Sequence, residues 1–515
     1  MATRGLSSEQ IQSALELRDD DSIIEGISDE DDSISLTAHA ETPQEGGESS
    51  SEYSSDDEVP LSTFSAPQPS QMNRRIYWKH LDDFAPSPPG VYHLPLASSH
   101  VRVLQTPFEY FTRYIPEKIF EIFSSFSNQT YLHKTGKNLG TTKDEMKIFF
   151  GICIAMSYLG LPRIKMYWMS KTRIPMIADR MTRDRFFRIR TNLKLVNDLD
   201  VDTAAKQNKF WKVQPLIETV RKACLENPRP QEVSIDEQII PFWGQVSMRQ
   251  FIRGKPNPCG LKNFVCTSPG GIPLDFFLYE GKGDSILPTG ETEGLDIGGK
   301  VVMRLANNLP EGSKLYMDRY FTSIELLDKL YTEKKMQGTG TLKKSKIPKA
   351  CNFKTDKQLK DQGRGSSDQL VRNDGVIACL KWFDNKPVVM ASSADSKLPE
   401  NKCRRWCKKT KQYIEINRPY AIQQYNENMG GVDMLDRVIS FYRISARSKK
   451  WTVRLIFHLF DFAAAAGWLV YRKEAQMLDT PKKGHSGLLG VQSRNSKFFA
   501  LFHSSKRANT PVRGS

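Results

Sequence analysis

The spacing of hydrophobic and polar positions changes twice along this chain. Between about residues 100 and 230, apolar residues recur at three- and four-residue spacings, as in the run from Phe108 to Phe123, which is the period of a helix with one buried face. From residue 231 the period becomes two, and SIDEQIIPF (234–242) alternates polar and apolar residues as a half-buried strand does. Beyond residue 438 the helical pattern returns.

The strand-rich region has the pattern of a mixed sheet. RQFIRGK and KNFVCTSPGGIPLDFFLYEG follow the first strand, and Pro269–Gly271 predicts the turn of a hairpin. KLYMD (314–318) and MQGTGTL are predicted strands on either side of the helical TSIELLDKLYTEK. A strand meander followed by strand–helix–strand suits an RNase H-like sheet. The segment MGGVDMLDR (429–437) is predicted to be helical, which places Asp433 and Asp436 on one face.

Both long apolar and long polar segments have simple interpretations. Residues 1–75 are rich in Ser, Asp, Glu and Gly and are expected to be disordered. LIFHLFDFAAAAGWLVY (455–471) has 17 residues and contains His458 and Asp461. A bilayer span needs about 20 residues with few charges, so we predict a buried helix and no membrane association.

The arginines of RDRFFRIRTNLKL could contact phosphates or form the solvent-exposed side of a core helix: Arg183, Arg185, Arg188 and Arg190.

Charge is distributed very unevenly. The chain has a net charge of +15, but residues 1–70 carry 17 acidic and 2 basic residues and the remainder is therefore near +30. A body this basic favours a polyanionic partner, most simply DNA. A solvated Lys-rich surface is the alternative. The eight scattered cysteines, from Cys153 to Cys407, suggest reduced thiols.

Four aspartates are the strongest candidates for chemistry. Asp236 lies in the first predicted strand, Asp318 ends the KLYMD strand, and Asp433 and Asp436 lie on the predicted helix. Carboxylates from separate elements can hold Mg²⁺ ions that activate an attacking oxygen and stabilise a leaving one at phosphorus. Any one aspartate could equally be a turn former or a solvated helix residue.

The sequence around these aspartates resembles the piggyBac-like transposase family. The matching strings are SIDEQIIPF…RGKPNPCGLK, YMDRYFTSIELL and YNENMGGVDMLDR…FYR, preceded by MKIFFGICIAMSYLGLPRIKMYW and RMTRDRFFRIRTNLKLVND. The resemblance covers roughly residues 105 to 475. It implies that Asp236, Asp318 and Asp433 are catalytic metal ligands and that Asp436 is a fourth carboxylate. It also implies two Mg²⁺ ions, with Mn²⁺ as a substitute.

The same resemblance implies an α/β fold. We expect an RNase H-like catalytic core, a mixed sheet with helices, that carries an inserted subdomain and a discontinuous helical domain. The expected divisions are an acidic arm (1–75), a helical dimerisation and DNA-binding region (76–230), a first core segment (231–344), an insertion (345–418), a second core segment (419–440), a helical completion (441–480) and a basic tail (481–515).

The function implied by the resemblance is transposition in the nucleus. A homodimer would bind transposon ends and TTAA target sites in double-stranded DNA, then cut and join strands by phosphoryl transfer. One alternative is a domesticated, transposase-derived protein that binds DNA or chromatin without cutting. Another is a general metal-dependent nuclease without a joining step.

Basic residues near the aspartates are candidate DNA contacts, namely Arg253, Lys255, Lys262, Arg447, Lys449 and Lys450. The sequence also departs from the family pattern in two places. Trp243 and Gln245 occupy positions where relatives often carry arginines. No cysteine follows Cys407, and Cys403 with Cys407 falls short of the four ligands of a structural zinc site, so no zinc is predicted.

Overall fold

The computed structural model describes residues 76–93, 103–198, 202–252, 257–281, 284, 294–408, 410–444 and 448–478. The predicted acidic arm (1–75) and basic tail (481–515) lie outside these residues.

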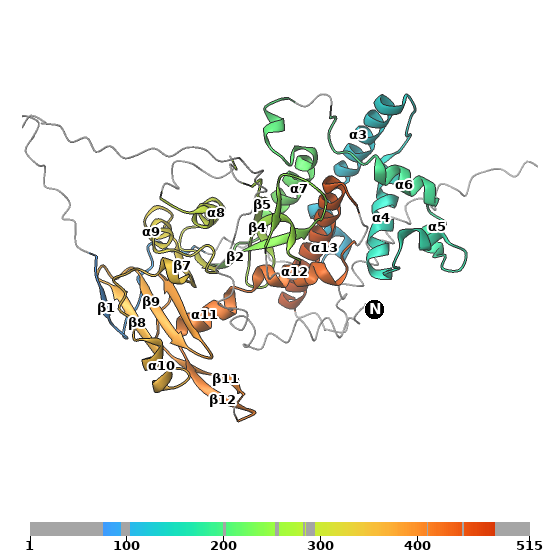
Figure 1. The fold of residues 1–515 in the computed structure, drawn as a ribbon. Coiled ribbons are helices and arrows are strands. Elements are labelled where there is room, and N and C mark those ends of the chain that lie inside the picture. The colour runs from blue at the N-terminus through green and yellow to red at the C-terminus, as the bar shows by residue number, and fades with distance from the viewer. Residues whose placement is uncertain are drawn as a thin grey trace, which may run out of the picture.

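A ten-stranded mixed sheet is the centre of the fold (Figure 1). Its strands are Trp78–His80 (β1), Glu232–Pro241 (β2), Arg249–Phe251 (β3), Cys259–Thr267 (β4), Pro273–Leu278 (β5), Lys314–Met317 (β6), Gln337–Thr341 (β7), Ser367–Arg372 (β8), Ala378–Phe383 (β9) and Pro387–Ser392 (β10). Their order is β1-β8-β9-β10-β7-β6-β2-β4-β3, and β5 also pairs with β4.

The middle of this sheet has the RNase H-like arrangement that the sequence predicts. Strands β2, β4 and β5 pair antiparallel as a meander, with the predicted turn after Thr267. Strand β6 then pairs parallel with β2, and β7 pairs parallel with β6. Parallel neighbours need a crossover, and helix α9 (Ile324–Glu333) supplies it between β6 and β7. The predicted fold class, a mixed sheet with helices, is confirmed.

The segment predicted as an inserted subdomain (345–418) extends the same sheet. Strand β10 pairs antiparallel with β7, so that Met390 lies opposite Thr341. Strand β1, which precedes the helical region in the chain, pairs with β8 at the far edge. The hairpin of β11 (Asn401–Cys407) and β12 (Gln412–Arg418) forms a separate two-stranded sheet. The pairing of these strands with the central sheet joins segments far apart in the chain, so local periodicity does not reveal it.

Helices before and after the sheet in the chain form one apolar body. They are α2 (Pro107–Tyr114), α3 (Glu117–Thr135), α4 (Lys143–Leu159), α5 (Pro175–Ala178), α6 (Arg183–Thr191), α7 (Gln214–Leu225) and α13 (Trp451–Met477). The rings of Phe150 on α4 and Phe460 on α13 stack with centroids 4.0 Å apart. Helix α13 is long and apolar enough to cross a membrane, yet 94% of its most apolar window is buried inside the fold. It is a core helix, as predicted.

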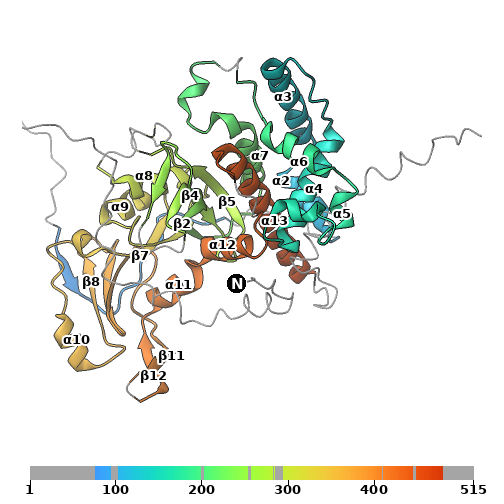
Figure 2. The same cartoon turned by 45° about the vertical axis from the view of Figure 1, so that its right-hand side comes forward.

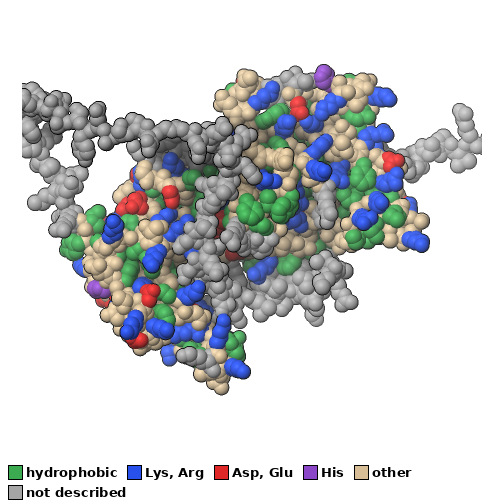
Figure 3. All heavy atoms as spheres, in the orientation of Figure 1, with side chains coloured by type: hydrophobic (Ala, Val, Ile, Leu, Met, Phe, Trp, Pro, Cys, Tyr) green, Lys and Arg blue, Asp and Glu red, His purple; other side chains and the backbone are tan. Residues whose placement is uncertain are grey.

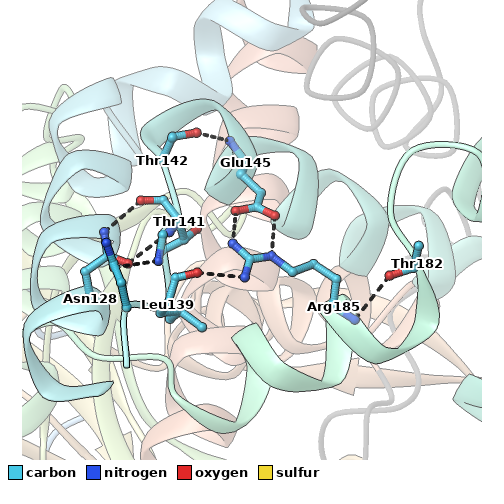
Figure 4. Close-up of polar contacts among 9 residues, drawn as sticks. Asn128, Leu139, Thr141, Thr142, Glu145, Thr182 and Arg185 are labelled. Carbon is cyan, nitrogen blue, oxygen red and sulfur yellow. Dashed lines mark hydrogen bonds and ion pairs between the residues drawn. The ribbon is translucent and has the colours of Figure 1, made fainter. Parts of the chain in front are cut away.

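Polar contacts fix the helices α4 and α6 against each other (Figure 4). Thr142 caps α4 by accepting the N–H of Glu145 at 3.2 Å. The Glu145 carboxylate binds the Arg185 guanidinium on α6 at 2.6 and 2.5 Å, and Arg185 also donates to the Leu139 carbonyl. Of the two interpretations left open for the arginines of α6, Arg185 therefore has the structural one.

Helices cover the two faces of the central strands differently (Figure 2). Helices α8 (Ile297–Ala306) and α9 pack with the residues Val233 and Ile235 of β2 on one face. Helix α12 (Gly431–Phe441) and α13 pack with Ile240 of β2 on the other face. Helix α11 (Tyr420–Asn428) joins β12 to α12. Helix α10 (Asp356–Gln362) lies beside β9.

Candidate active site

Asp236 and Asp318 lie next to each other on parallel strands. Ile235 of β2 is in register with Met317 of β6, and each aspartate is the following residue. Ile235 points to the face that α8 and α9 cover, and successive strand residues point to opposite faces. The side chains of Asp236 and Asp318 therefore point to the other face, which α11 and α12 cover. Both side chains are partly exposed. The Asp318 carboxylate accepts the N–H of Tyr320 at 2.9 Å, and the chain turns directly after it into α9.

Contacts on either side of Asp236 place α12 over it. Ser234 donates its hydroxyl to the Met429 carbonyl at 2.5 Å, and Gln238 donates to the Asp436 carboxylate at 2.7 Å. These two β2 residues share the face of Asp236. The helix segment between Met429 and Asp436, which contains the exposed Asp433, therefore runs past Asp236.

Gly431 permits this close approach of helix and sheet. A Cβ at this position would lie 2.3 Å from the Ser268 carbonyl oxygen and 2.3 Å from the Thr267 hydroxyl oxygen. Its neighbour Gly430 has φ −77°, so the glycine pair is explained by space and not by a left-handed backbone.

The buried Tyr425 of α11 lies within the electrostatic influence of three of the aspartates. Burial raises the pKa of this tyrosine first, and the charges of Asp318, Asp236 and Asp433 each raise it further. Tyr425 is 4% exposed and hydrogen bonds through its side chain with Thr341 of β7. These effects agree with a position of Asp236, Asp318 and Asp433 on the side of the sheet that α11 and α12 cover.

A chain of hydrogen bonds positions Asp436. Gln238, whose amide donates to Asp436, accepts from Asn263 at 3.2 Å and lies 3.0 Å from His458 Nε2. Burial and the charges of Arg443 and Arg454 hold the pKa of His458 well below its usual value. The imidazole is therefore neutral, and its Nε2–H can donate to the Gln238 oxygen.

The donor set suits a hard cation. Mg²⁺ prefers oxygen ligands, takes one or two carboxylates and keeps water or substrate phosphate as its other ligands. Asp236 and Asp318 supply such a pair on adjacent strands. Among the residues that the structure describes, no three His, Cys, Asp or Glu side chains form a group that could hold a metal ion. A metal bound by Asp236 and Asp318 would therefore take its other ligands from water or substrate phosphate.

The opposite face of the sheet holds Glu237 and Lys262. Their charged groups lie 3.9 Å apart, and both side chains are at most 9% exposed. The Lys262 ammonium also lies 4.2 Å from the centre of the Tyr320 ring. Glu237 therefore points away from the candidate metal ligands. We predicted a DNA contact at Lys262, but its interior position on the face away from Asp236 argues against it. Lys262 points to this face because side chains alternate between the two faces along β4.

Two of the other candidate DNA contacts lie within the described residues. Lys449 and Lys450 are exposed just before α13, and Lys450 donates to the Thr191 carbonyl at 2.7 Å. Burial and the charges of Lys134 and Lys194 lower the pKa of Lys450, so this corner is a concentration of positive charge. Arg253, Lys255 and Arg447 lie outside the described residues.

Sequence reasoning missed three residues of the site, namely Gln238, Tyr425 and His458. Gln238 lies two residues after Asp236 and therefore on the same strand face, which was a usable signal. Tyr425 belongs to YNENMGGVDMLDR, but no pattern shows that it faces the aspartates. His458 is one polar residue in an apolar run, and its contact with β2 is visible only in the fold.

Several known proteins are similar to this chain. A family model described as Transposase IS4 matches residues 106–468. The human piggyBac transposable element-derived protein 3 is 32% identical over 431 residues, which are 81% of this chain and 70% of the relative. The human piggyBac transposable element-derived protein 2 is 29% identical over 374 residues, 69% of this chain and 61% of that relative.

One solved structure is similar in fold. It is the cryo-EM structure of a piggyBac transposase synaptic complex with hairpin DNA, with a TM-score of 0.65 and 21% sequence identity. The match covers 80% of this chain and 84% of that one.

Proposed function

Because the chain belongs to the piggyBac-type transposase family, we propose that it is a DNA transposase that cuts and joins strands at TTAA sites. The observation that carries the proposal is that Asp236 and Asp318 directly follow paired residues of β2 and β6, on the face over which Gln238 holds Asp436 of α12. Each step of such a reaction is a displacement at phosphorus, so one set of carboxylates can serve all of them.

Each carboxylate has a role that follows from its position. Asp236 and Asp318, on rigid neighbouring strands, would hold Mg²⁺ or Mn²⁺ together with Asp433 from α12. When bound, the ions supply Lewis-acid stabilisation of the attacking and leaving oxygens. Asp436, tied to Gln238 at 2.7 Å, would orient a ligand water or a metal. The buried Tyr425 closes the site on the α11 side and excludes water there.

The proposed partner is double-stranded DNA, bound by a homodimer in the nucleus. The body of the chain is strongly basic, since residues 1–70 hold 17 of its 59 acidic residues and only 2 of its 74 basic ones. Lys and Arg side chains are spread across the visible face of both the helical body and the β8–β12 region (Figure 3). A synaptic complex with hairpin DNA is the state of the structurally similar transposase.

A second candidate function is a transposase-derived protein that binds DNA without cutting it. The names of the human relatives describe proteins derived from a transposable element. The Trp243 side chain, which replaces a basic residue common in the family, is 72% exposed, so DNA would meet an apolar surface there. The four aspartates would then be remnants.

An excision assay in cells separates the two functions. A reporter gene is interrupted at a TTAA site by the genomic repeats that flank this protein's own gene. Under the transposase proposal, wild type restores the reporter precisely, Asp318→Asn does not, and Glu237→Gln, from the other face of the sheet, does. Chromatin binding by wild type and Asp318→Asn alike, without excision by either, would establish the non-cutting function instead.

A further inference from the structure

The β11–β12 hairpin has a basic and aromatic outer face that the catalytic proposal does not use. Lys402, Arg404 and Trp406 alternate along β11 and are exposed, while the residues between them are buried or partly buried. Across the hairpin, Trp406 lies opposite Tyr413 and Arg404 opposite Glu415. We call these five side chains the hairpin outer face.

Two aromatic rings project from this face. Trp406 is 45% exposed and Tyr413 is 56% exposed, and their ring centres lie 5.2 Å apart at 70°. The Arg404 guanidinium lies 5.0 Å from the centre of the Tyr413 ring. A pair of exposed rings beside an arginine is the composition of a surface on which nucleic-acid bases stack.

The charge of the hairpin matches a phosphate backbone. Residues 401–418 contain seven Lys and Arg and one Glu. Lys408 and Lys411 at the turn are exposed together with Lys402 and Arg404. The lower tip of the molecule in Figure 3, where Figure 1 draws β11 and β12, accordingly carries several basic side chains.

Buried contacts hold the hairpin rigidly. Asp384, which follows β9, accepts hydrogen bonds from Arg405 at 3.1 Å and from Arg364. Arg364 also donates to the Trp406 carbonyl at 2.9 Å. An ordered backbone lowers the entropy that the aromatic pair would lose on binding.

The hairpin is also coupled to the candidate active site. Cys403 and Ile416 on its inner face belong to the same apolar cluster as Tyr425 and Met429. Strand β12 ends at Arg418 and α11 begins at Tyr420. The inner face of the hairpin therefore packs beside α11, and the outer face points away from this cluster.

We propose that the hairpin outer face binds a single-stranded segment of the DNA substrate. Trp406 and Tyr413 would stack on unstacked bases, and the four exposed cations would neutralise the adjoining phosphates. Stacked bases inside a duplex offer no face to these rings, so the aromatic pair favours a single-stranded segment. The inference rests on the proposed function, because strand cleavage produces such segments.

Fluorescence anisotropy with purified full-length protein tests the proposal. The probes are a blunt labelled duplex and the same duplex with a single-stranded 3′ tail. Trp406→Ala and Tyr413→Ala should each weaken binding of the tailed DNA by roughly 5- to 150-fold, the range for loss of one base stack. Binding of the blunt duplex should change by less than about two-fold, and Trp406→Phe should retain most of the affinity.

Tyr77→Ala is the matched control, because Tyr77 is also 56% exposed but lies beside β1 at the far edge of the sheet. Thermal unfolding checks that each variant is folded. Unchanged binding of tailed DNA by the hairpin variants overturns the inference, and so does an equal loss for both probes. Failure of wild type to bind either DNA overturns the proposed function as well.

Discussion

The two faces of strand β2 differ in character although they alternate residue by residue. On one face, Val233 and Ile235 are fully buried against α8 and α9. On the other, Ser234 and Gln238 hold α12 by hydrogen bonds and leave Asp236 between them, partly exposed. The first face supplies an apolar core that fixes the strand, and the second carries the chemistry on that rigid support.

Asp236 and Glu237 show what this difference means for single residues. They are adjacent carboxylates, yet Asp236 lies on the face of the sheet that α12 covers, whereas Glu237 lies 3.9 Å from Lys262 on the other face. Position on the sheet therefore decides function where residue type does not. The following changes test that separation, from the largest expected effect to the smallest.

Asp236→Asn should abolish strand cleavage, whereas Glu237→Gln should leave it nearly intact. Loss of a metal-binding charge removes several kcal/mol of transition-state stabilisation, which corresponds to about a thousand-fold in rate or more. The measurement is cleavage of labelled transposon-end DNA in Mg²⁺, with DNA affinity determined in parallel. Equal losses of activity in the two variants would contradict the claim that only the Asp236 face of β2 carries the catalytic residues.

Gln238→Met should lower cleavage about 10- to 100-fold, the usual effect of losing a partner that orients a metal ligand. The change deletes the hydrogen bond to Asp436 and the contact with His458. Cleavage rates at saturating DNA give the effect.

Lys262→Met is its control, since Lys262 is also buried on a neighbouring strand but on the other face. It should cost stability and leave both the cleavage rate and DNA affinity close to wild type. Weaker DNA binding by this variant would restore the contact first predicted for Lys262.

Asp461→Asn should change the pH dependence of stability without stopping cleavage. Burial raises the pKa of Asp461 on α13 to about 7, from 3.8. The folded protein therefore holds a proton that the unfolded chain has lost between these values, and its stability falls as pH rises through about 7. Asparagine does not titrate, so the variant does not lose this stability as pH rises. Its side-chain oxygen still accepts the N–H of Ile444.

Urea unfolding at pH 5, 7 and 9 measures the difference. Between pH 5 and pH 9 the variant should gain at most about 3 kcal/mol of stability relative to wild type, because about two pKa units separate pH 5 from the pKa of Asp461 and each corresponds to about 1.4 kcal/mol. A difference that stays constant between pH 5 and pH 9 would contradict the buried carboxyl.

Sequence reasoning succeeded where local period decides structure. Strands β2 and β6, the helix of Asp433 and the buried α13 follow from residue spacing, and the motifs around the aspartates point to the family. It did not anticipate that β10 would pair with β7 or that Lys262 would be buried, because strand register joins segments far apart in the chain. The partners of Asp436 were missed for the same reason, since His458 reaches β2 across 220 residues.

The central claim is that the aspartates of β2, β6 and α12 form one divalent-cation site. Mn²⁺ titration followed by electron paramagnetic resonance tests it directly, without relying on activity. Wild type and Glu237→Gln should bind Mn²⁺ equally, and Asp318→Asn should bind at least about 10-fold more weakly. Equal Mn²⁺ binding by wild type and Asp318→Asn would contradict the claim.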